Sequence, residues 1–209
     1  MGRPWPWAAL LAVAAASAIA AEGPVSRVPQ VGDADAGPVV AGIYAGIRAG
    51  GSEPLTMHRA VANAPELFAA YVGMARAVRR DAQVPRAFRE LAVLRTLQLE
   101  GGDYNLDQHS AMALSCGITA PQIAALPAWR GSGLFDARQQ AVLAWAEGMA
   151  TRGGPDADAY AALARSFDPR EVVELTLTAA FYAASARTTK ALGVVPDRAA
   201  ASASHYGAC

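Results

Sequence analysis

Three polar side chains near a glycine pair have the chemistry for proton transfer: Glu90, Tyr104 and His109. If the segments before and after Gly101-Gly102 are antiparallel helices, Glu90 can face His109. A carboxylate bonded to an imidazole fixes the tautomer of the ring and stabilises its protonated form, as a general acid or base requires. Tyr104 could then offer a hydroxyl to a substrate oxygen. The alternative is a purely structural Glu–His pair, which is common between neighbouring helices.

Three further charged residues are candidates for binding a substrate. Glu174 is the only charged residue between positions 172 and 186, and an unpaired carboxylate is costly to bury. We expect it to pair with Arg187 or Arg95. That pair would be either a structural salt bridge or part of the substrate pocket.

The histidines and cysteines do not suggest a metal or a redox cofactor. His58, His109 and His205 have no metal-ligand spacing, and two cysteines are too few for a thiolate zinc site. We therefore expect no metal and no cofactor. Cys116 is interpreted as a small buried side chain and Cys209 as a tail thiol, while a disulfide between them stays open if the protein is exported.

The elements that must position these residues are all predicted to be helices. Apolar spacings of three and four, helix-capping boxes and terminal glycines recur after Pro54, and no strand alternation or glycine-rich phosphate loop is present. The fold class is therefore all-α. Predicted helices cover residues 65–80, with Leu67, Tyr71, Met74 and Val78 as the buried face, then 85–99 and 103–115, the segments after the caps at Thr119 and Asp136, and 169–192.

The helix predicted at 169–192 is apolar on nearly every side, which indicates a central helix or a subunit interface. It completes a helical domain at residues 54–196. We interpret residues 22–53 as an extended arm or linker with at most a short helix near 42–49. Residues 197–209 form a polar tail.

The first 21 residues have the three parts of a secretory signal peptide. A short start with Arg3 as its only charge precedes an apolar run of about fourteen residues that ends in Ala18-Ile-Ala20. An uncleaved anchor would need about 20 apolar residues. We therefore expect a periplasmic or secreted protein with no stable membrane association after cleavage. Because Lys+Arg and Asp+Glu both number 18, the charge balance does not favour nucleic acid as a partner.

The order of several segments resembles the carboxymuconolactone decarboxylase family of the AhpD-like superfamily. The segments are Glu90-Leu-Ala-Val-Leu-Arg, Asp103-Tyr-Asn-Leu-Asp-Gln-His109, Gly117-Ile-Thr-Ala-Pro-Gln, Phe135-Asp-Ala-Arg-Gln and Ala191-Leu-Gly-Val194. The resemblance extends from about Leu55 to Val194. It implies an all-α homo-oligomer, a trimer or hexamer, with pockets near the subunit contacts.

The chain departs from the hydroperoxidase branch of that superfamily. That branch has a Cys-x-x-Cys pair before the histidine that matches His109, whereas Gly102 and Asn105 stand at the matching positions here. A dithiol peroxidase needs one thiolate to attack peroxide and a second to resolve the sulfenic acid. Leu106 stands where many members have tryptophan, so we expect a different pocket shape.

The resemblance implies an acid–base lyase that acts on a small unsaturated or lactone carboxylic acid, and the N-terminal residues add the expectation that it is exported. His109 would deliver a proton to carbon as carbon dioxide leaves, Glu90 would hold the imidazole, and Tyr104 would stabilise the developing charge. Export does not fit the literal family reaction, because aromatic-acid catabolism is ordinarily cytoplasmic. Two alternatives stay open: a hydroperoxide reductase of the same fold, and a non-catalytic oligomer that binds small acids.

Overall fold

The computed structural model describes residues 26–152, 154–197 and 209, and in these ranges the regular structure is entirely helical. The all-α prediction is confirmed. The predicted signal peptide and most of the polar tail lie outside the described residues. The helices are α1 (Pro38–Ala49), α2 (Thr56–Val61), α3 (Pro65–Arg76), α4 (Arg86–Glu100), α5 (Asp103–Ser115), α6 (Ala120–Ala125), α7 (Ala137–Arg152), α8 (Ala157–Ala164) and α9 (Pro169–Leu192), with a π-helical turn η1 (Ala77–Asp81) and a 3-10 segment η2 (Leu126–Gly131).

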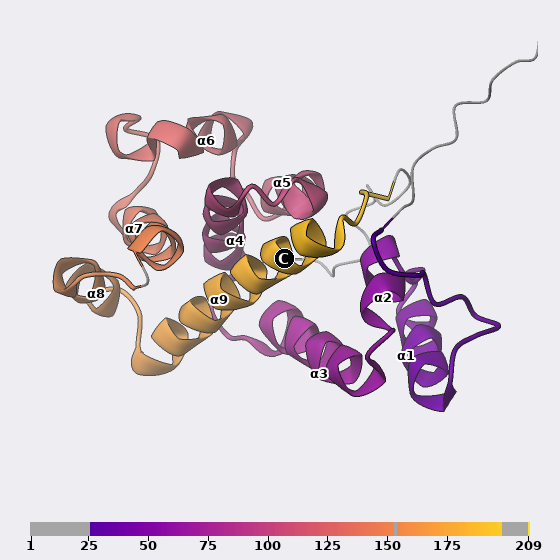
Figure 1. Cartoon of the computed structure of the whole chain (residues 1–209). Helices are drawn as coiled ribbons and strands as arrows, with labels where there is room; N and C mark the ends of the chain where they lie inside the picture. Colours follow the sequence, from indigo (N-terminus) through magenta and orange to yellow (C-terminus); the bar gives the residue numbers. More distant parts are fainter. Residues whose placement is uncertain (1–25, 153, 198–208) are drawn as a thin grey trace, which may run out of the picture.

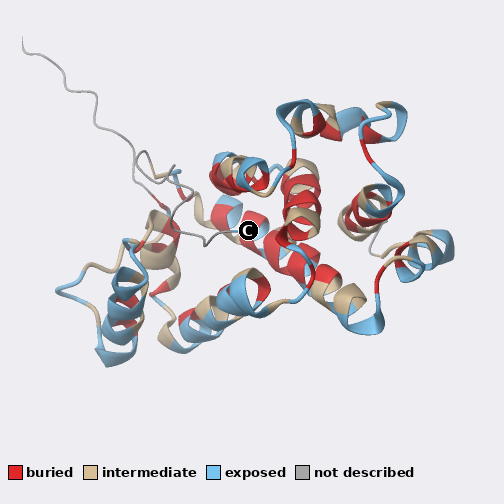
Figure 2. Ribbon diagram, turned by 180° about the vertical axis from the view of Figure 1, so that it is seen from behind, coloured by how far each residue is buried: buried red, intermediate tan, exposed pale blue. Residues whose placement is uncertain are grey.

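Helices α4 and α9 form the centre of the molecule, and the other helices surround them (Figure 1). Helix α4 packs against α5, α7 and α9. Its apolar residues Leu91, Leu94 and Leu97 are fully buried, and the buried residues concentrate along α4 and the middle of α9 (Figure 2). Glu90 therefore lies on a helix at the rigid centre of the molecule, and His109 lies on a helix that packs against it.

The helix ends follow from local signals in the sequence. Asp168 and Thr119 form the predicted capping boxes at the starts of α9 and α6. Gly193 ends α9 with a left-handed backbone. These bonds join residues three apart in the chain, which explains why the sequence predicts them correctly.

The glycine pair between α4 and α5 is required by both conformation and space. Gly101 has φ +62°, which residues with a side chain rarely adopt. A Cβ atom on Gly102 would lie 2.8 Å from Cδ2 of Leu97 and 2.9 Å from Cβ of Ala186. The turn therefore packs directly on α9 and fixes where α5 begins.

Two predictions on the N-terminal half are correct only in part. Helix α1 begins at Pro38 rather than near residue 42, and it packs on α3 through buried Tyr44, whose ring meets Phe68 edge to face. On the predicted face of residues 65–80, Val78 is buried and Tyr71 and Met74 pack against the same core cluster, but Leu67 is 71% exposed and Phe68 is buried in its place. The neighbours of α3 select this face, and the apolar spacing by itself fitted either choice.

A disulfide joins Cys116 to Cys209, with their Cα atoms 5.2 Å apart. Cys116 is the C-cap residue of α5. The bond therefore ties the last residue of the chain to the helix that carries His109. The sequence left open whether Cys116 and Cys209 are separate thiols or form a disulfide, and in the structure they form the disulfide.

None of the helices in the described part of the chain has the length and hydropathy that a membrane span requires.

Candidate functional site

Glu90 and His109 meet inside the protein, where α4 packs on α5. His109 Nδ1 lies 2.7 Å from Glu90 Oε2, and both residues are only 3% exposed. The second carboxylate oxygen of Glu90 accepts a hydrogen bond of 3.1 Å from Nε of Arg86, one turn earlier on α4. The carboxylate is therefore held on both oxygens and in turn holds the imidazole in one orientation.

The charge state of Glu90 follows from these partners. Burial by itself would raise the pKa of Glu90, but the attraction and hydrogen bond of His109, joined by those of Arg86, outweigh it and lower the pKa. Glu90 is therefore an anion at neutral pH. Because Nδ1 of His109 bonds to this anion, proton transfer to a substrate would use Nε2.

Tyr182 on α9 is the tyrosine whose ring packs edge to face on His109, with ring centroids 4.6 Å apart. It is fully buried, and its hydroxyl accepts a hydrogen bond of 3.0 Å from Nε of Arg79. Burial raises the pKa of Tyr182, so the ring is a neutral phenol. In the sequence, Tyr182 is one of many apolar residues of a helix, and Arg79 is one of several arginines near a helix end. Neither signal identifies a site.

Tyr104 has a different environment from the one predicted. Its hydroxyl donates to Oδ2 of Asp197 at 2.6 Å and accepts from the backbone N–H of Met57 at 3.3 Å. Asp197 also accepts from the backbone N–H of Thr56 at 3.0 Å. Tyr104 thus links α5 to the start of α2 and to the segment after α9.

The two positions that carry thiols in the hydroperoxidase branch form no redox pair here. Gly102 packs too closely on Leu97 and Ala186 to accommodate a side chain. The Asn105 amide donates to Ser185 Oγ at 3.2 Å, and Tyr71 donates to the same hydroxyl oxygen at 2.8 Å. A buried polar cluster therefore takes the place of the thiols.

The predicted pairing of Glu174 with Arg187 or Arg95 is wrong. Glu174 accepts from Arg170 at 2.9 Å and from the backbone N–H groups of Gln83 and Val84 at 2.7 and 2.9 Å. Arg187 forms a two-bond ion pair with Glu100 at the exposed end of α9. Glu174 and Arg187 therefore connect the ends of helices to neighbouring segments. Which segments lie next to them depends on how the helices pack, and the sequence did not reveal that packing.

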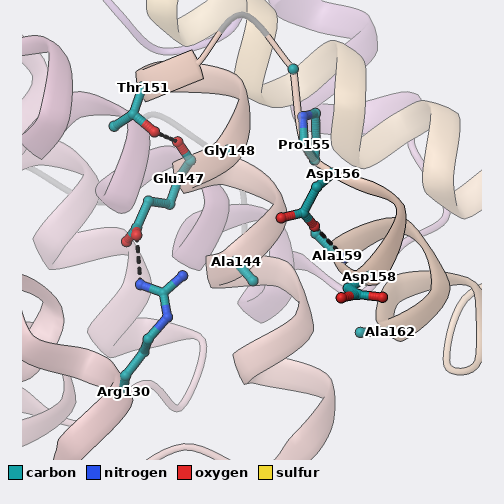
Figure 3. A pocket seen from close by; sticks show the side chains of 11 residues that line it. Arg130, Ala144, Glu147, Gly148, Thr151, Pro155, Asp156, Asp158, Ala159 and Ala162 are labelled. Atoms are coloured by element: carbon teal, nitrogen blue, oxygen red, sulfur yellow. Dashed lines mark hydrogen bonds and ion pairs between the residues drawn. The ribbon is translucent and has the colours of Figure 1, made fainter.

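Arg95 binds Glu147 of α7, with Nε 3.1 Å from Oε2. Glu147 lies in a surface pocket of about 230 Å³ between α7 and α8 (Figure 3). Two of the acidic groups of this pocket have structural roles, because Glu147 also bonds to Arg130, and Asp156 caps α8.

Within the residues that the structure describes, no three His, Cys, Asp or Glu side chains gather as metal ligands would.

Residues 65–148, which include both Glu90 and His109, match the model of the carboxymuconolactone decarboxylase family. This part of the chain is therefore similar to the carboxymuconolactone decarboxylase family, and the fold is AhpD-like. No curated protein matches the sequence at a significant level.

Solved structures share this fold at low sequence identity. A peroxidase-related protein with an alkylhydroperoxidase AhpD core, from Ralstonia eutropha JMP134, has a TM-score of 0.73 and 19% identity over 88% of this chain and 98% of its own. The debrominase Bmp8 has a TM-score of 0.68 and 18% identity over 88% and 97%. A peroxidase-related protein from Silicibacter sp. TM1040 has a TM-score of 0.68 and 17% identity over 84% and 96%. At this level of identity the likeness shows the fold alone.

The Glu147 cluster predicts a pH-dependent contribution to stability. Burial would raise the pKa of Glu147, but hydrogen bonds from Trp129, Arg130 and Arg95 lower it from 4.5 to about 2. A carboxyl with a lowered native pKa stabilises the fold above its ordinary pKa, and this contribution disappears as the pH falls from about 4.5 to 2. Glu147→Gln should therefore lose roughly 1–2 kcal/mol of unfolding free energy at pH 7, after allowance for solvent screening.

Urea denaturation at pH 7, 4 and 2.5 measures this effect. The difference between Glu147→Gln and wild type should shrink with pH. Glu66→Gln, at an exposed position on α3, is the matched control and should change little at any pH. A constant difference across the series would contradict the ionic origin of the stabilisation.

Proposed function

We propose that this protein is an acid–base lyase that acts on a small unsaturated or lactone carboxylic acid, with His109 as the proton-transferring residue. The buried 2.7 Å bond between His109 and Glu90 carries the proposal. A buried carboxylate that orients an imidazole and stabilises its protonated form is the arrangement that general acid catalysis needs. The match of residues 65–148 to the carboxymuconolactone decarboxylase family supports the same class of reaction.

In the proposed reaction the bond from the carboxylate carbon to the neighbouring carbon breaks, and carbon dioxide leaves. The electron pair of that bond moves into the conjugated carbonyl system as an enolate. His109 then gives its proton to carbon, and Glu90 stabilises the imidazolium before transfer. Asn105, one turn before His109 on the same face of α5, supplies one amide N–H for the enolate oxygen, while the other N–H of the amide bonds to Ser185.

Thiol chemistry is less well supported. Gly102 and Asn105 replace the thiols of the hydroperoxidase branch, and Cys116 is bonded to Cys209. Cys116 also caps the C-terminal end of α5, where the carbonyl dipoles disfavour a thiolate. A peroxidase that used Cys116 would therefore need a thiolate at a helix end where the dipole of α5 disfavours negative charge.

The protein is further proposed to be a homo-oligomer, a trimer or hexamer, that associates through α9. Val173 and Leu177 are 54% and 45% exposed, and Ala180 and Ala184 continue the same face at helical spacing. A groove of about 440 Å³ runs beside them, between α9 and Met149-Ala150 of α7. Small side chains next to large exposed ones allow a second helix to approach closely and bury apolar surface.

Export to the periplasm or the medium is also proposed. Its support is the charged start, short apolar run and Ala-Ile-Ala end of the first 21 residues. The disulfide between Cys116 and Cys209 agrees with export, since thiols in the bacterial cytoplasm are kept reduced.

Replacing His109 tests the proposed chemistry. His109→Gln should keep the fold and cut turnover by roughly 10²–10⁴, the usual share of general acid–base catalysis. Glu90→Gln should cost less, because the imidazole is retained with weaker orientation. Carbon dioxide release from a panel of small unsaturated and lactone acids is the measurement, and Cys116→Ser is the control that should stay near the wild-type rate.

An inactive Cys116→Ser with an active His109→Gln would assign the protein to thiol chemistry instead, and a wild type that decarboxylates no acid of the panel would contradict the lyase assignment.

A charge on the exposed stripe of α9 tests the oligomer. Leu177→Asp should lower the mass measured by light scattering, because a carboxylate would be buried against the neighbouring subunit. Leu67→Asp on α3 places the same charge at another exposed leucine and should leave the mass unchanged. A wild type that scatters at the 21.6 kDa of a single chain would rule out this assembly.

N-terminal sequencing tests export. Protein secreted by a bacterial host should begin near Ala21 or Glu22, and it should contain no free thiol before reduction. A membrane fraction that holds the chain with an intact Met1 would contradict the proposal.

A further inference from the structure

The groove of about 440 Å³ beside α9 lies where α7 ends and α9 continues. Trp145 of α7 donates to Oγ1 of Thr176 on α9 at 3.1 Å, which places the two helices side by side. Helix α7 ends seven residues after Trp145, whereas α9 continues for sixteen residues after Thr176. The last turn of α7 therefore lines one side of the groove and the later turns of α9 line the other. Its volume is within the range of about 300–1,000 Å³ that is usual for small-molecule sites.

Most of the groove is lined by methyl groups. From Ala179 to Thr188 it follows nine residues of α9, about 13–14 Å at a rise of 1.5 Å per residue. A surface of this length and composition matches an extended aliphatic chain, which would bury apolar area along it. The apolar residues that line the groove are Met149, Ala150, Ala179, Ala180, Ala183 and Ala184.

Thr96 of α4 brings an unpartnered hydroxyl to this groove. It lines the groove, is 1% exposed, and its Oγ1 has no hydrogen-bond partner in the described part of the chain. The other buried threonines described, Thr178 and Thr189, donate to carbonyl oxygens of their own helix at 2.7 Å and at 3.0–3.1 Å. A buried hydroxyl without a partner destabilises a fold. An acceptor group in the groove would therefore recover a hydrogen bond that Thr96 does not make within the chain.

The groove is separate from the candidate proton-transfer site. Thr96 and Glu90 are six residues apart, about one and two-thirds turns, so they lie on different faces of α4. Glu90 faces α5 through its bond to His109, whereas Thr96 lines the groove with α7 and α9. A ligand of the groove therefore does not depend on the proposed lyase function.

The end of the groove near Thr96 offers hydrogen-bond donors and positive charge. Arg187 and Thr188 line this end, and Arg187 uses Nε and Nη2 for Glu100, so its Nη1 is not part of that pair. Glu100 lies one turn after Thr96 on α4. Lys190 donates to the backbone carbonyl of Glu100 at 3.0 Å, so two cations here meet one carboxylate. A carboxylate, which only accepts hydrogen bonds, matches these donors.

We propose that the groove binds an aliphatic monocarboxylate of medium chain length. Its carboxylate accepts a hydrogen bond from the Thr96 hydroxyl and pairs with Nη1 of Arg187, and its chain lies along the alanine methyl groups of α9. A dicarboxylate with a charge at each end would place its second charge among methyl groups, where no partner offsets the loss of water. The site therefore selects a single charged head with an apolar tail.

Binding of decanoate, whose extended chain has a length similar to that of the groove, tests the assignment without turnover. Calorimetric titration below the micelle concentration should show one decanoate bound per chain. Butyrate keeps the carboxylate and lacks most of the chain, while decan-1-ol keeps the chain and lacks the carboxylate. Each should bind more weakly by roughly 10-fold or more, because each loses one of the two contributions.

Filling the groove tests its location. Ala184 is exposed, so Ala184→Leu should fold normally while its larger side chain occupies the space of the ligand. Its affinity for decanoate should fall by about 10- to 100-fold. Ala191→Leu makes the same change at an exposed position of α9 outside the groove and should bind decanoate as wild type does.

Thr96→Val separates ligand binding from a structural role. It removes the hydroxyl and keeps the shape of the side chain, so decanoate affinity should fall by about 10-fold, the loss of one hydrogen bond to a charged acceptor. The melting temperature without ligand should stay the same or rise, because no hydrogen bond within the chain is lost. Thr178→Val is the matched control: it removes the hydroxyl bond to Glu174 outside the groove, so it should lower the melting temperature and keep the affinity.

Three results would overturn the assignment. The first is a Thr96→Val or Ala184→Leu variant that binds decanoate normally, and the second is a wild type that does not bind it. The third is a wild type that fails to bind while Leu177→Asp, the variant designed to separate subunits, binds decanoate. That pattern would show that a second copy of the chain occupies the groove. None of these results bears on the role of His109, which carbon dioxide release tests independently.

Discussion

The hydrogen bond between Glu90 and His109 sets the main constraint on this structure, because it lies where water cannot solvate either group. A buried carboxylate is tolerated only when both oxygens have partners. His109 and Arg86 supply them. The geometry of α4 and α5 must keep these groups in place, and the glycine pair at 101–102 does so by turning the chain tightly against α9. The imidazole is consequently held by the core of the protein, with no contribution from a flexible loop.

Three arginines extend this constraint outward from α4. Arg86 neutralises Glu90, and Arg89 binds the carbonyls of the π-helical turn. That turn directs Arg79 toward Tyr182. Each step satisfies a buried polar group, and together they place a cation next to the ring that packs on His109. The same contacts that stabilise this end of the fold therefore organise the candidate site.

The fold of this chain is shared with proteins of different descriptions. The similar structures include peroxidase-related proteins and a debrominase, and fold by itself does not determine function. In this chain a glycine too crowded for a side chain and a buried Asn–Ser–Tyr cluster occupy the region of the thiols. In this chain the Glu90–His109 pair lies beside that cluster on α5, with Arg86 on its other side.

The sequence by itself determined the features that depend on neighbours along the chain. Capping boxes, terminal glycines and apolar spacing located most of the longer helices, because those hydrogen bonds and contacts join residues three or four apart. It also indicated the Glu90–His109 pair, since two helices joined by a glycine turn have few ways to pack. Only the tertiary structure decided the partners of Arg79, Arg95, Glu174 and Arg187. The ion pairs of Arg95 and Arg187 and the Arg79–Tyr182 bond join residues 52 to 103 positions apart. A charge and a helical period do not say which distant helix lies alongside; that depends on how all the apolar faces pack together.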